Sequence, residues 1–107
     1  MDVKRLLSDL SRSEDLSPFR LLVEPLAEHD RRRGSDLVKT LRTYFAASAN
    51  ASEAADRLFL HRNSMAYRLE RIGKLTGLDL REPGQALALQ LGLLSLRREE
   101  TDEDKHP

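Results

Sequence analysis

The sequence predicts an all-α fold, a small bundle of about six helices. Apolar residues recur at the spacing of an amphipathic helix in most segments, and the run from residue 19 to 26 is one example. Proline and glycine stand where such helices would begin and end, as Pro83 and Gly77 do. At 107 residues, the chain has the length of one small domain.

Three regions are expected along the chain. Residues 1–17 would form an N-terminal helix and a linker, because a polar, turn-like stretch follows apolar residues at helical spacing, namely Val3, Leu6, Leu7 and Leu10. Residues 18–97 would form the globular domain. Residues 98–107 are dense in charge and lack apolar side chains, so we expect a disordered tail there.

The first helix of the domain should begin near Pro18, and Pro25 should kink it or split it into two shorter turns. Three consecutive arginines, Arg31 to Arg33, then precede Gly34. Cations are favourable at the C-terminus of a helix, and glycine is a common residue just beyond it. The arginines could equally form a corner that contacts phosphate groups, and both interpretations stay open.

A long helix is expected next, capped by Ser35 or Asp36. Its apolar stripe is assigned to the core and consists of Leu37, Leu41, Tyr44 and Phe45, with Val38 at the border.

The stretch from Ser52 to Thr76 has the pattern of two short helices joined by a tight turn. Ser52 would cap the first helix, and small side chains at Ala54 and Ala55 would let the second helix approach closely. Asn63 would cap the second helix, which buries Met65, Leu69 and Ile72 and ends near Gly77. The turn carries Phe59, where many helix-turn-helix proteins have glycine.

The opposite face of the second helix carries hydroxyl, aromatic and cationic groups. They recur at helical spacing and are Ser64, Tyr67, Arg68, Arg71 and Lys74. Such a surface suits the major groove of DNA. The sequence therefore predicts a helix-turn-helix that binds double-stranded DNA.

A block of residues at fixed spacing covers both helices and the turn: Ala55, Leu58, Leu60, His61, Arg62, Asn63, Ser64, Met65, Tyr67, Arg68 and Leu69. This block resembles the signature of a known family, the PucR-type helix-turn-helix domain of PucR- and CdaR-like bacterial transcription regulators. Upstream blocks that match are Pro25, Leu26, His29 and Asp30, followed by Leu37, Thr40, Leu41 and Tyr44. Downstream, residues 76–80 and the leucine-rich stretch from Ala86 match the closing elements of the family.

The resemblance implies sequence-specific DNA binding as the output domain of a bacterial transcriptional regulator, with a recognition helix at about residues 63–76. In such regulators an N-terminal part usually senses a metabolite, so we expect no effector ligand to bind this segment. The chain would then be a fragment of a longer regulator or a stand-alone output domain.

Eight residues are candidates for contacts with DNA: His61, Arg62, Asn63, Ser64, Tyr67, Arg68, Arg71 and Lys74. Arg62 could pair with guanine or a phosphate, and Arg68 is the strongest candidate for a direct contact. Four of the candidates have an alternative without a contact to DNA, and for Arg62 it is a solvated arginine in the turn. Asn63 could only cap the helix, His61 could only brace the turn, and Tyr67 could pack against a neighbouring helix.

The last helix, after Pro83, is apolar nearly all round. One stripe consists of Leu87, Leu91 and Leu94, and the other of Leu89, Leu93 and Leu96. Either the helix is central to the bundle, or the second stripe forms a homodimer with a partner chain. A helical module for dimerisation or protein docking, without DNA binding, is therefore the alternative function.

Charge is segregated along the chain although the formal net charge is zero. Residues 1–30 carry a net charge of −3 and residues 98–107 another −3, whereas residues 31–81 carry +6. Positive charge thus collects around the helix-turn-helix, where phosphate contacts require it. A solvated helical surface with local fluctuation in charge would give the same pattern.

Several other classes of function lack support in the sequence. The chain has no cysteine, and its three histidines lie on separate segments without a partner at ligand spacing, so we expect no metal, no cofactor and no enzyme activity. No apolar run approaches the roughly 18 residues that cross a bilayer. We therefore expect a cytoplasmic protein that does not bind membranes.

Overall fold

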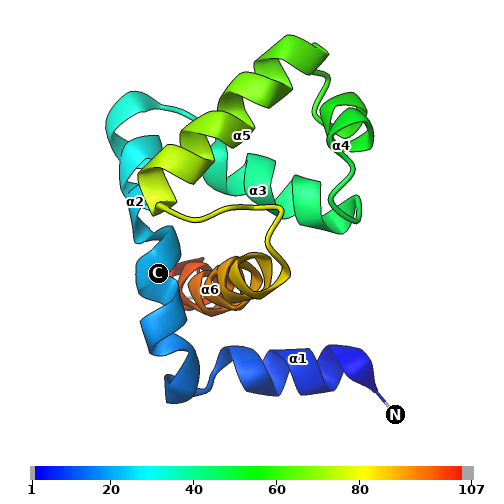
Figure 1. Ribbon diagram of the computed structural model, residues 1–107. Helices are drawn as coiled ribbons and strands as arrows, with labels where there is room; N and C mark the ends of the chain where they lie inside the picture. The colour runs from blue at the N-terminus through cyan, green and yellow to red at the C-terminus, as the bar shows by residue number, and fades with distance from the viewer. Residues whose placement is uncertain (1, 105–107) are drawn as a thin grey trace.

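A computed structural model describes the backbone of residues 2–104 and the side chains of residues 2–97. This part of the chain is all-α, as predicted, and contains six α-helices and one short 3-10 helix (Figure 1). The elements are α1 (Val3–Ser11), η1 (Glu14–Leu16), α2 (Ser17–Arg33), α3 (Leu37–Ala46), α4 (Ala51–Arg57), α5 (Arg62–Thr76) and α6 (Pro83–Asp104).

Helix α2 joins the two ends of the bundle. Helix α2 packs along α6 and also contacts α3 and α5, while α3, α4 and α5 contact one another. Helix α1 contacts α6 from the other side, so α1 and α5 lie at opposite ends of the molecule in Figure 1. This arrangement leaves α4 and α5 at the surface farthest from α1.

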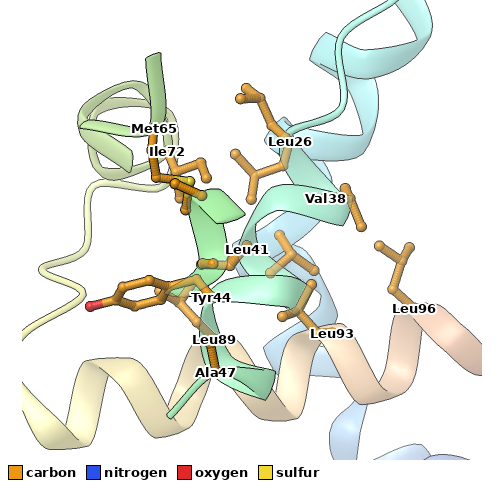
Figure 2. Close-up of a cluster of buried hydrophobic side chains, with 14 residues drawn as sticks. Leu26, Val38, Leu41, Tyr44, Ala47, Met65, Ile72, Leu89, Leu93 and Leu96 are labelled. Atoms are coloured by element: carbon orange, nitrogen blue, oxygen red, sulfur yellow. The ribbon is translucent and has the colours of Figure 1, made fainter. Parts of the chain in front are cut away.

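The core is built from side chains of α2 to α6. Figure 2 shows them converging between the helices, and the largest fully buried apolar residues are Leu26, Leu41, Met65, Ile72, Leu89 and Val23. The predicted stripe of α3 faces this core, where Leu37, Leu41 and Tyr44 are buried and Phe45 packs at the edge. The core therefore holds α5 through Met65 and Ile72.

The second stripe of α6 packs inside its own chain, so these leucines do not form the dimer surface that was one of the two expectations, whereas Leu87 of the first stripe is exposed. Leu89, Leu93 and Leu96 are only 0%, 6% and 7% exposed, because they pack in the core of their own chain. Gly92 lies beside them, and a Cβ atom there would stand 2.5 Å from the backbone oxygen of Phe19 in α2. Glycine thus allows α2 and α6 to approach closely.

Helix α2 runs without interruption through Pro25, so the predicted split does not occur. Proline removes only one hydrogen bond, the one to the carbonyl of Leu21, and Leu21 lies on the exposed side. Val23 and Leu26 on either side of the proline are fully buried. Their packing holds the helix together as far as Gly34, which ends it in the left-handed conformation at φ 65°.

The N-terminus of α3 is capped by Asp30 of α2, and not by Ser35 or Asp36 as expected. The two carboxylate oxygens of Asp30 accept hydrogen bonds from the backbone N–H groups of Leu37 at 2.8 Å and Val38 at 3.0 Å. Asp36 occupies the cap position but makes no side-chain cap. The two hydrogen bonds to Asp30 thus connect the end of α2 to the start of α3.

The predicted N-terminal helix is present as α1, and Asp2 caps it by accepting from the N–H of Arg5. None of its residues is buried. Its apolar stripe, Val3, Leu6, Leu7 and Leu10, remains 41–59% exposed.

At the other end of the chain, α6 extends to Asp104, although an irregular tail was predicted from residue 98. Arginine and glutamate have high helix propensity, so the helix continues past the last apolar residue. Residues 105–107 of the predicted tail lie outside the described residues.

Candidate nucleic-acid interface

Helices α4 and α5 form the two helices of the predicted helix-turn-helix. Helix α4 begins two residues earlier than expected, because Asn50 and not Ser52 is its cap and accepts from the N–H of Glu53 at 3.0 Å. Ala54 and Ala55 are 0% and 3% exposed and face the core. Their small size lets α4 pack closely on its neighbours α3 and α5, as predicted.

The turn between the two helices contains an unusual residue, Phe59. Its backbone is left-handed at φ 56°, a conformation that favours glycine, and its ring is 96% exposed. A large side chain in this position costs conformational energy and makes few contacts in the free protein.

His61 caps α5, and this corrects the role given to Asn63. The ring Nδ1 of His61 accepts a hydrogen bond of 3.0 Å from the N–H of Asn63. A neutral imidazole that accepts at Nδ1 carries its proton on Nε2, so an exposed N–H donor remains. The side chain of Asn63 is not used as a cap and lies exposed in the first turn of α5.

The N-terminal half of α5 exposes most of the candidate contact residues. Arg62, Asn63 and Ser64 are exposed, and Tyr67 is 67% exposed and so does not pack into the bundle. Farther along, Lys74 forms an exposed ion pair of 3.1 Å with Glu70. Six of the eight candidates, from His61 to Lys74, thus lie at the surface of the helix-turn-helix.

Arg68 is placed differently from the other candidates. Its side chain is half-buried, and Nη1 donates a hydrogen bond of 3.1 Å to Oγ1 of Thr40 in α3. Thr40 is fully buried, and its own hydroxyl donates to the carbonyl of Asp36. Arg68 therefore fastens α5 to α3. Helical spacing alone could not reveal this, because the partner lies 28 residues away.

Arg71 is half-buried as well, and together with Arg68 it lines a groove beside α5. We call it the corner groove, because its other wall is the corner between α2 and α3. Its volume is about 670 Å³, and side chains from both walls line it, among them Tyr67 from α5 and His29 and Arg33 from α2. Neither a contact role for His29 nor this groove was predicted from the sequence.

Other kinds of site find little support in the described part of the chain. No group of three or more His, Cys, Asp or Glu side chains there could bind a metal ion. Within the same residues, no helix is both long enough and apolar enough to span a membrane.

Fold and surface together define a helix-turn-helix domain, with α4 and α5 as the two helices and a polar, cationic face on α5. The chain matches the description "PucR C-terminal helix-turn-helix domain" over residues 37–95, which is more than half its length. It belongs to this family of helix-turn-helix domains, as the residue signature predicted.

Several curated proteins are similar to this chain, and their names are those of transcriptional regulators and activators. The purine catabolism regulatory protein of Bacillus subtilis is 39% identical over 93 residues, which cover 86% of this chain and 17% of that protein. The carbohydrate diacid regulator of Escherichia coli is 37% identical over 73 residues, which cover 67% of this chain and 19% of that protein. The DNA-binding transcriptional activator AdeR of Bacillus subtilis is 32% identical over 75 residues, which cover 70% of this chain and 18% of that protein.

The chain thus spans less than a fifth of the length of each of these relatives. No solved structure gives a significant match.

Proposed function

We propose that this domain binds double-stranded DNA in a sequence-specific manner, with α5 in the major groove. The observation that carries the proposal is the exposed first turn of α5, where Arg62, Asn63 and Ser64 stand together on a helix that the core holds in place. In helix-turn-helix proteins, the residues at the N-terminal end of the second helix contact the edges of bases.

Each side chain has a role that suits its chemistry. Asn63 can bind adenine through its amide, and Arg62 can bind guanine through its guanidinium group. Ser64 can reach a base edge or a phosphate. Arg71 and Lys74 lie farther along α5, where they would contact the phosphate backbone.

His61 adds one further donor, because its Nε2–H is left for a phosphate after Nδ1 has capped the helix. Its structural role and its proposed contact with DNA are therefore compatible.

We also propose that the domain is the output module of a bacterial transcriptional regulator, and that any effector binds elsewhere. The alternative is a helical module for dimerisation or protein docking without DNA binding, and the leucines expected to form a dimer surface are buried within this chain. The hydrophobic core of the chain itself contains these residues, Leu89, Leu93 and Leu96.

A binding experiment with genomic DNA fragments tests the proposal. Purified domain should enrich a defined sequence, and affinity for it should fall about 5- to 150-fold in Arg62→Ala if the arginine contacts a base. Arg5→Ala is the matched control, because it removes the same charge from α1, at the opposite end of the molecule. Retention of fragments without any shared sequence, or equal losses in the two variants, would contradict base recognition by α5.

A further inference from the structure

We propose that the corner groove holds the sugar-phosphate backbone of the bound DNA and that Arg33 of α2 contacts a phosphate there. This inference rests on the proposed DNA binding by α5 and extends the contact surface to α2. Arg33 lies outside residues 37–95, to which the family match is confined.

Charge is the first argument for an anionic occupant. The groove is lined by three arginines, Arg33, Arg68 and Arg71, together with His29, while Asp36 is its single acidic lining residue. The nearby carboxylate of Asp30 is engaged with the N-terminus of α3. The cationic side chains therefore outnumber the acidic one, as a phosphate site requires.

Arg33 differs from the two arginines that precede it in α2. Arg31 is paired with Glu28 at 2.5 Å, and this hydrogen bond lowers the pKa of the Glu28 carboxyl group, so the pair is ionised and neutral overall at neutral pH. Arg32 is exposed but does not line the groove. Of the three consecutive arginines, only Arg33 combines exposure with a position in the groove wall.

The wall that carries Arg33 is held in a fixed geometry. The hydroxyl of Ser35 donates to Oδ1 of Asp30 at 2.5 Å, and its oxygen accepts from Nδ1 of His29 at 2.8 Å. Together with the cap of α3, these bonds connect the last turn of α2 to the start of α3. A pre-organised wall loses little entropy when it binds a ligand.

Position is the second argument. Asn63, Ser64 and Tyr67 belong both to the proposed recognition face of α5 and to the lining of the groove. A helix in the major groove has a phosphate backbone on each side, and neighbouring elements of helix-turn-helix proteins contact it. The corner groove is continuous with the recognition face, so one backbone strand would enter it.

The test compares Arg33→Ala with Arg32→Ala, two substitutions that remove the same charge from adjacent positions of α2. Affinity for the selected duplex is measured over a range of salt concentrations. The slope of log affinity against log salt should become shallower by about 0.9 in Arg33→Ala and should hardly change in Arg32→Ala. The preferred sequence should be unchanged in both variants, because a phosphate contact carries no base preference.

Arg33→Lys, which keeps the charge, should restore most of the slope, and thermal unfolding should show equal stability of all variants. Equal slopes for Arg33→Ala and Arg32→Ala would overturn the inference, and so would a loss in Arg33→Ala that follows a loss of stability. A wild-type domain that selects no sequence would instead contradict the proposed function. The two failures are therefore distinguishable.

Discussion

Phe59 in the turn between α4 and α5 combines a left-handed backbone with an almost fully exposed ring. Glycine adopts this backbone conformation freely, whereas other residues pay about 1–2 kcal/mol for it. Phe59→Gly should therefore raise the free energy of unfolding by about 1 kcal/mol, after the greater freedom of glycine in the unfolded chain is subtracted. Urea denaturation measures this change, and a less stable variant would mean that the ring makes stabilising contacts.

Arg68 illustrates how a candidate contact can have a structural role. Because it donates to the buried hydroxyl of Thr40, Arg68→Ala should lower the free energy of unfolding by about 1 kcal/mol, whatever its effect on DNA binding. A double-mutant cycle with Thr40→Val isolates the bond between the two side chains. Additive losses in the double variant would show that the bond contributes nothing to stability.

At the scale of whole helices, α6 and α1 have similar leucine-rich stripes with opposite environments. Leu89 of α6 is fully buried, whereas Leu7 of α1 is 46% exposed. Leu89→Ala should destabilise the domain by about 2–5 kcal/mol, because it leaves a cavity in the core, while Leu7→Ala should cost less than about 1 kcal/mol. Chemical denaturation of both variants tests the pair, and similar losses would contradict the assigned environments.

The helices themselves could be predicted well from the sequence, because the signals involved are local. Apolar spacing located α1 and α5, and Gly34 and Gly77 end their helices in the left-handed conformation as expected. The cap of α3 could not be predicted in the same way, since Asp30 reaches it from the preceding helix. An apolar stripe predicts a buried face only where another element covers it, and this explains the exposed stripe of α1.

For the molecule as a whole, the signature predicted the family. Helical spacing predicted an exposed face of α5, which is confirmed for Ser64, Tyr67 and Lys74 but not for the half-buried Arg68 and Arg71. Neither pattern predicted the corner groove, because His29 and Arg33 meet α5 only through the packing of α2. The same is true of the bond between Arg68 and Thr40, which requires the tertiary fold. The contacts between separate helices could therefore not be predicted from the sequence.

The central claim is that α5 reads the bases of double-stranded DNA, and one measurement tests it most directly. The wild-type domain and Asn63→Ala are each used to select duplexes from a randomised library. Asn63 is exposed and its side chain caps no helix, so its removal should leave the fold intact. We predict that the wild type selects a defined sequence and that the variant loses the preference at one or two positions, at a cost of about 1–3 kcal/mol each. Identical selected sequences for the two proteins would contradict base recognition by Asn63, and no selected sequence for the wild type would contradict the account as a whole.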